Sequence, residues 1–134
     1  MMDDFLSSEK KKILLVDDNA TVLRSIKEIL SSQYEVAVAK SGKKALDQMR
    51  LDKPDLILLD YEMPEMDGRE VFMEMRTDME LFTIPVIFLT GVNDRDHIAQ
   101  ALALRPAGYL LKPVSTVKLL QTIESVMKEF YEEG

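Results

Sequence analysis

Two hydrophobic patterns alternate along this chain. Short unbroken apolar runs are typical of central strands in a parallel sheet, which are buried on both faces. Three such runs occur, at residues 13–16, 56–59 and 86–89. Residues 34–39 alternate large side chains with small or polar ones, as an edge strand does, and residues 108–111 form a fifth candidate. We therefore expect five strands.

Between these strands, apolar residues recur at the three- and four-residue spacing of amphipathic helices. The five apolar stripes are Val22, Ile26, Ile29 and Leu30; Ala45, Leu46 and Met49; Val71, Phe72 and Met75; Ile98, Ala101 and Leu102; and Leu119, Leu120, Ile123, Val126, Met127 and Phe130. Asn19, Ser41 and Ser115 are candidate N-caps, and Asp67 with Glu70 resembles a capping box. Alternating strands and helices predict an α/β fold with right-handed crossovers and a doubly wound parallel sheet.

Reactive side chains stand at the ends of the predicted strands. The first strand ends in Asp17 and Asp18, the third in Asp60, the fourth in Thr90 and the fifth in Lys112. Each type also has an ordinary explanation: aspartate as a turn former or cap, threonine as a strand residue, lysine as a solvated loop residue. In a doubly wound sheet, however, ligands bind outside the carboxyl ends of the strands. Because all five residues fall at that edge, we interpret them as one site.

This set of residues is suited to phosphoryl chemistry. Three carboxylates form a hard oxygen site for Mg²⁺, with Mn²⁺ as the alternative metal. Such a metal neutralises charge on a phosphoryl group and frees one carboxylate to act as a nucleophile. Lys112 would add a positive charge and Thr90 a hydroxyl donor. Without a metal, repulsion among the carboxylates should raise at least one of their pKa values.

Composition and charge narrow the class of protein. A chain of 134 residues suits one domain, and a net charge of −7 argues against direct binding of nucleic acid. The absence of cysteine excludes a disulfide framework. No apolar run is long enough to cross a bilayer, and the first residues lack a signal-peptide pattern. We expect a cytoplasmic protein without membrane insertion, with residues 1–10 as a flexible lead-in to one domain over residues 11–131.

Four motifs at the strand ends give the chain a resemblance to a known family. They are VDDN at 16–19, LLDYEMPEMDG at 58–68, FLTG at 88–91 and YLLKP at 109–113. In order and spacing, residues 10–131 resemble the CheY-like receiver domain of a two-component response regulator. The resemblance implies a flavodoxin-like (βα)5 fold with strand order 2-1-3-4-5.

The resemblance also implies roles for the residues at the strand ends. Asp60 would accept a phosphoryl group from a histidine kinase or a histidine phosphotransfer protein. Asp17, Asp18 and Asp60 would bind Mg²⁺ together with the backbone carbonyl of Glu62, and Lys112 would contact the phosphoryl group. A receiver domain is not an enzyme beyond Mg²⁺-dependent self-phosphorylation from a phosphodonor and slow self-dephosphorylation.

For signal output, Thr90 and Tyr109 match the switch pair of the family. The hydroxyl would move toward the phosphoryl oxygens while the aromatic ring rotates inward. The signalling face would consist of the fourth helix, the fifth strand and the fifth helix. It would act on a downstream target that the sequence does not name, or form a phosphorylation-dependent homodimer.

Three further features lead to specific expectations: the pair Arg105–Pro106, the Lys112–Pro113 bond and His97. The family usually has glycine where this chain has Arg105, followed by Pro106, so we expect the fourth helix to end early or differently. The Lys112–Pro113 bond should be cis, because the lysine must turn back into the site. His97, the only histidine, is expected to be a solvated helix residue.

Two alternatives belong to other functional classes. A phosphorylation-independent pseudo-receiver, acting only as a binding module, would normally have lost one of the five site residues. A phosphatase of the haloacid-dehalogenase type would carry a DxDx[TV] motif after the first strand, whereas this chain has Asp17-Asp18-Asn19-Ala20. Such a phosphatase would also need a cap segment, for which the chain has no room. Both comparisons favour a phosphoacceptor receiver.

Overall fold

The computed structural model describes residues 10–91 and 95–132, which form an alternating series of strands and helices. The predicted lead-in falls almost entirely outside the described residues. In chain order the elements are β1 (Lys12–Val16), α2 (Ala20–Leu30), β2 (Glu35–Ala39), α3 (Gly42–Leu51), β3 (Leu56–Asp60), α4 (Gly68–Arg76), β4 (Val86–Gly91), α5 (Arg95–Ala103), β5 (Gly108–Lys112) and α6 (Thr116–Tyr131).

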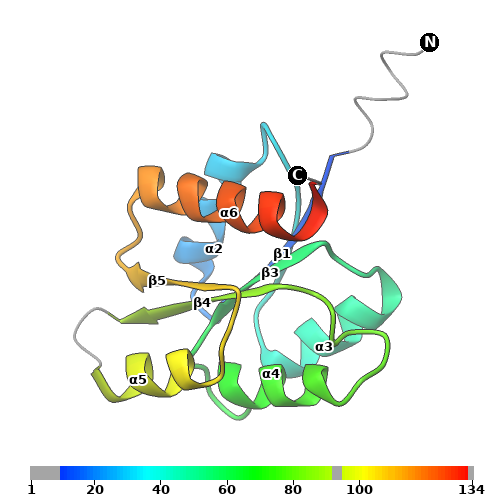
Figure 1. The fold of residues 1–134 in the computed structure, drawn as a ribbon. Helices are drawn as coiled ribbons and strands as arrows, with labels where there is room; N and C mark the ends of the chain where they lie inside the picture. Colours follow the sequence, from blue (N-terminus) through cyan, green and yellow to red (C-terminus); the bar gives the residue numbers. More distant parts are fainter. Residues whose placement is uncertain (1–9, 92–94, 133–134) are drawn as a thin grey trace.

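The five strands form one parallel sheet in the order β2-β1-β3-β4-β5 (Figure 1). The predicted fold class and strand order are therefore confirmed. The chain passes from β1 outward to β2 and then returns to β3 on the other side of β1. The carboxyl ends of β1 and β3 consequently lie side by side at a topological switch point, where α/β sheets bind their ligands.

Helices cover both faces of the sheet, α2 and α6 on one face and α3, α4 and α5 on the other (Figure 1). Successive strand residues point to opposite faces, so each strand contributes to two cores. In β3, for example, Ile57 and Leu59 pack with α3 and α4, whereas Leu56 and Leu58 pack with α2 and α6. This is why the central strands are unbroken apolar runs.

The helix starts are as predicted. The side chains of Asn19, Ser41 and Ser115 each accept hydrogen bonds from backbone N–H groups in the first turn of the following helix. Asp67 and Glu70 form a full capping box at the start of α4. In α2, α3, α4 and α6, side-chain acceptors therefore satisfy N–H groups that the first turn of the helix leaves unpaired.

The predicted apolar stripes are largely buried, with exceptions on three helices. In α2, Leu23 is fully buried, whereas Val22 is only partly so. Leu102 in α5 and Phe130 in α6 are each 45% exposed, so these two members of the apolar stripes lie outside the core. Ala101 is the one buried residue of α5. This helix thus buries fewer of its residues than any of the other helices does.

The connections around β5 bear on two expectations. The Lys112–Pro113 bond is cis, as predicted. The helix α5 ends at Ala103, and Arg105 has a φ of 55°, in the left-handed region that glycine normally occupies. Arginine thus takes the backbone conformation of the expected glycine, and the chain still enters β5 in register with β4. Among the described helices, none has the length and apolar character to span a membrane.

Candidate functional site

The end of β1 places one carboxylate in the interior and one at the surface. Asp17 is fully buried, and its backbone N–H bonds to the carbonyl of Ala39 at 3.1 Å. Its Oδ1 accepts the backbone N–H of Asn19 at 2.9 Å, and its Oδ2 accepts from Nζ of Lys112 at 2.7 Å. Asp18 is exposed. The pair therefore offers one fixed, paired carboxylate and one that water can reach.

The end of β3 places Asp60 beside Asp17. Asp60 is 4% exposed, and its Oδ1 lies 3.3 Å from the donating N–H of Glu62 and 3.2 Å from Nζ of Lys112. Lys112 thus links the two buried carboxylates in a single ion-paired group. An ammonium between two carboxylates balances only one of their charges.

Gly68, the first residue of α4, fixes the backbone at Asp60. A Cβ on Gly68 would lie 2.4 Å from the carbonyl oxygen of Asp60 and 2.9 Å from Cα of Tyr61. The N–H of Gly68 also donates to the carbonyl of Tyr61 at 2.9 Å. The start of α4 is therefore seated directly on the backbone that carries Asp60, in a space that admits no side chain.

The electrostatic state of the site depends mainly on Asp60. The pKa of Asp60 is raised from 3.8 to about 7: burial is the largest cause and the charge of Asp17 adds to it, while Lys112 and the N–H of Glu62 act in the opposite direction. The pKa of Lys112 is also raised: burial favours its neutral form, but its bonds and charge contacts with Asp17 and Asp60 outweigh that effect. The predicted rise of a carboxylate pKa is thus confirmed, with burial as its largest cause.

The three predicted metal ligands come together. Asp17, Asp18 and Asp60 each offer a carboxylate oxygen, and these oxygens lie within 4.8 Å of one another. They line a pocket of about 370 Å³ that also includes Glu62 and Lys112. An all-oxygen set with surplus negative charge fits a hard divalent cation such as Mg²⁺, which would relieve the repulsion that, after burial, raises the pKa of Asp60.

The two predicted switch residues are placed differently. Thr90 is 2% exposed and lines the same pocket, and among the described residues its Oγ1 has no hydrogen-bond partner. A buried hydroxyl without a partner is costly and suits a ligand atom that would accept a hydrogen bond from it. Tyr109 is 40% exposed and does not line the pocket. The structure thus brings Thr90, but not Tyr109, to the site.

Two residues of α5 that sequence reasoning did not assign to the site lie beside it. Nδ1 of His97 is 3.0 Å from Oε2 of Glu62, and His97 lines the pocket, so it is not simply a solvated helix residue. Gln100 accepts a hydrogen bond of 3.1 Å from the hydroxyl of Tyr61. One signal was available in the sequence: α5 begins at the carboxyl edge of the sheet, so its first turns necessarily lie near the site.

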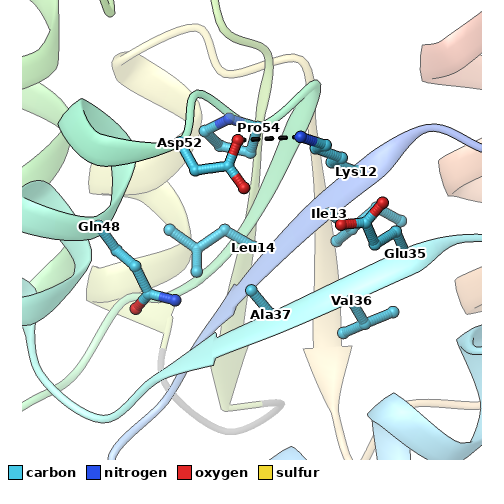
Figure 2. Close-up of a pocket in the computed structure, with 9 residues that line it drawn as sticks. All are labelled: Lys12, Ile13, Leu14, Glu35, Val36, Ala37, Gln48, Asp52 and Pro54. Atoms are coloured by element: carbon cyan, nitrogen blue, oxygen red, sulfur yellow. Dashed lines mark hydrogen bonds and ion pairs between the residues drawn. The ribbon is translucent and has the colours of Figure 1, made fainter.

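A second hollow lies where β1, β2 and α3 meet, near the opposite ends of the strands. It measures about 70 Å³ and is lined by Leu14, Ala37 and Gln48, with an ion pair of 2.9 Å between Lys12 and Asp52 at its mouth (Figure 2). Apart from that partly exposed pair, its lining is largely aliphatic. The reactive groups of the described chain therefore converge on the carboxyl edge and not on this hollow.

Comparison with known proteins gives a consistent result. The family model described as "Response regulator receiver domain" matches residues 13–124. The chain is 35% identical over 121 residues to the polar-differentiation response regulator DivK of Brucella ovis, covering 87% of this chain and 96% of that protein. It is 34% identical over 125 residues to the transcriptional regulatory protein CrdR of Helicobacter pylori, covering 92% of this chain and 56% of that protein.

The fold is also similar to solved structures of response regulators and receiver domains. A response regulator from Chloroflexus aurantiacus superposes with a TM-score of 0.84 at 28% identity, covering 89% of this chain and 98% of that one. The signal receiver domain of a histidine kinase from Syntrophus aciditrophicus gives 0.83 at 30% identity, covering 92% and 95%. The chain spans about half the length of several relatives it matches, such as the transcriptional regulator ycf27 of Cyanophora paradoxa, of which it covers 49%.

Proposed function

Because this chain belongs to the family of response regulator receiver domains, which act in two-component signalling, we propose that Asp60 is its phosphoacceptor. The observation that carries this assignment is the position of Asp60. It is the buried carboxylate of the site whose pKa is raised to about 7. It also lies 3.2 Å from Nζ of Lys112 and lines the acidic pocket.

The transfer step uses the ionised carboxylate of Asp60. One of its oxygens attacks the phosphorus of a phosphohistidine, the new O–P bond forms as the N–P bond breaks, and the histidine imidazole leaves. Asp17, Asp18, Asp60 and the backbone carbonyl of Glu62 would hold Mg²⁺, with Mn²⁺ as the alternative, and the metal supplies charge neutralisation at the phosphoryl oxygens.

Lys112 and Thr90 act on the product. Nζ of Lys112, now shared between Asp17 and Asp60, is close enough to pair with a phosphoryl oxygen once Asp60 carries the phosphoryl group as an acyl phosphate. The hydroxyl of Thr90 would donate to another oxygen, which satisfies a buried group that otherwise has no partner among the described residues. Tyr109 would then rotate inward, into space that Thr90 leaves.

The output surface would be formed by α5, β5 and α6, the elements predicted as the fourth helix, fifth strand and fifth helix. It carries exposed apolar side chains that a target or a second copy could cover: Leu102, Tyr109, Leu111 and Val117. A receiver domain implies a histidine kinase as a partner. A phosphotransfer protein as donor, the cytoplasm as the compartment and residues 11–131 as the domain are parts of the same proposal.

Mass spectrometry with a small phosphodonor tests the proposal. Acetyl phosphate with Mg²⁺ should add one phosphoryl group to the parent protein, labile at alkaline pH as an acyl phosphate is. Asp60→Asn should abolish the addition, while Asp47→Asn, the same change at an exposed carboxylate on α3, should not. Full labelling of Asp60→Asn would place the phosphoacceptor elsewhere. A folded parent that takes up no phosphoryl group would favour the pseudo-receiver.

A further inference from the structure

The two residues that directly follow Asp60 both contact α5. The hydroxyl of Tyr61 donates to Oε1 of Gln100 at 3.1 Å, and Oε2 of Glu62 lies 3.0 Å from Nδ1 of His97. The rings of Tyr61 and His97 are also in contact, with centroids 5.2 Å apart. His97 and Gln100 are three residues apart and so lie on one face of the helix.

These contacts matter because α5 buries few of its own side chains. Ala101 is its one buried residue, whereas α2, α3, α4 and α6 each bury three or four. An alanine contributes little apolar area. The contacts to Tyr61 and Glu62 therefore supply an unusually large share of the attachment of α5.

Tyr61 and Glu62 differ in their freedom to move. Tyr61 is 2% exposed and packs edge-to-face on Phe88 with ring centroids 5.2 Å apart, so its hydroxyl is a fixed point. The Glu62 side chain is 61% exposed. Of the two contacts, the one between Glu62 and His97 is thus the one that can open without disturbing the core.

Glu62 also faces the group that phosphorylation would change. Glu62 and His97 line the same pocket as Asp60, and the N–H of Glu62 donates to Oδ1 of Asp60. A phosphoryl group on that carboxylate adds negative charge to the pocket that Glu62 lines, and this charge repels the carboxylate of Glu62. The repulsion acts on the carboxylate that reaches α5.

We propose that the contacts from Tyr61 and Glu62 form a latch that holds α5 on the unphosphorylated domain, and that phosphorylation opens the Glu62–His97 half of this latch. The inference rests on the proposed function, since it takes Asp60 as the phosphoacceptor. It provides a route from the site to α5 that does not pass through Thr90 or Tyr109. His97 is a positioning residue in this scheme, and Glu62 is the group that senses the new charge.

Hydrogen exchange of the α5 backbone, read by mass spectrometry, tests the latch in the unphosphorylated protein. His97→Ala and Gln100→Ala should each speed exchange of α5 about fivefold, as expected for losing one contact worth about 1 kcal/mol. Alanine has the higher intrinsic helix propensity, so faster exchange cannot arise from a poorer helix former. Arg95→Ala, at an exposed position of the same helix, should leave exchange unchanged.

Exchange with acetyl phosphate and Mg²⁺ present tests the opening. In the parent, phosphorylation should speed α5 exchange about as much as His97→Ala does, and in His97→Ala it should add little. Glu62→Gln keeps the shape but removes the charge, so this variant should retain slow exchange before phosphorylation and lose most of the response afterwards.

The outcomes separate the latch from the proposed function. Phosphoryl uptake by mass with no change in α5 exchange overturns the opening but leaves Asp60 as phosphoacceptor. No uptake overturns both the phosphoacceptor assignment and the opening. If His97→Ala and Gln100→Ala leave α5 exchange at the parent rate, there is no latch, whatever the phosphorylation result.

Discussion

At the scale of single residues, the raised pKa of Asp60 makes the stability of the domain depend on pH. Between its ordinary pKa of 3.8 and its folded value of about 7, Asp60 holds more proton in the folded than in the unfolded protein. Without metal, stability should therefore fall as pH rises through this window, by at most about 1.4 kcal/mol per pH unit. Urea unfolding at pH 5, 6 and 7 measures the slope.

Asp60→Asn provides the comparison, because it removes the titrating group at nearly constant shape. The variant should lack this part of the slope and, at pH 7 without metal, should unfold at a higher urea concentration than the parent. Equal slopes in the two proteins would show that another group is responsible for the pH dependence.

Thr90 leads to a second prediction in which removing a buried polar group stabilises the folded protein. Its buried Oγ1 lacks a partner among the described residues, and leaving such a group unpaired costs about 1 kcal/mol or more. Thr90→Val replaces the hydroxyl by a methyl of similar size. We expect the unphosphorylated variant to be more stable by about 1 kcal/mol in urea titrations. It should still be phosphorylated by acetyl phosphate, and loss of labelling in a folded variant would contradict the role given to the hydroxyl.

At the scale of elements, Arg105 in the turn between α5 and β5 has a left-handed backbone conformation. Residues with a Cβ disfavour this conformation. A left-handed backbone costs a residue with a Cβ about 1–2 kcal/mol, and glycine returns roughly half of that through its freer unfolded chain. Arg105→Gly should thus stabilise the domain by about 0.5 kcal/mol in thermal or urea unfolding. Ala99→Gly, at an exposed position in the middle of α5, should destabilise it by about 1 kcal/mol.

The same elements show how far the sequence could carry prediction. Asp17, Asp60 and Lys112 were assigned to one site because parallel strands bring their carboxyl ends to one edge, whatever the details of packing. The contacts of His97 depend on how α5 is rotated about its axis. The apolar stripe of α5 is too weak to fix that rotation, since Leu102 belongs to the stripe and is nevertheless exposed. Local signals such as caps were reliable because they act within one turn.

At the scale of the whole molecule, a metal should act as part of the fold. Mg²⁺ binds the assembled carboxylates and not the unfolded chain, so it should stabilise the protein by mass action. At ten times its dissociation constant the gain is about 1.4 kcal/mol, which raises Tm by roughly 5 °C. Thermal melts with and without Mg²⁺ measure this shift. Asp18→Asn, which changes an exposed ligand, should reduce the shift, and a full shift in this variant would remove Asp18 from the site.

The close seating of Gly68 on the carbonyl of Asp60 has a consequence for mutational tolerance. A Cβ there would lie 2.4 Å from a backbone oxygen, and backbone cannot rotate away as a flexible side chain can. In a saturation library selected for phosphorylation, position 68 should accept no replacement, alanine included. The exposed neighbouring position, Arg69, should accept many. Gly68 has no reactive group, yet it would then be as intolerant of substitution as the nucleophile itself. The reason is that only a residue without a Cβ fits against the backbone of Asp60.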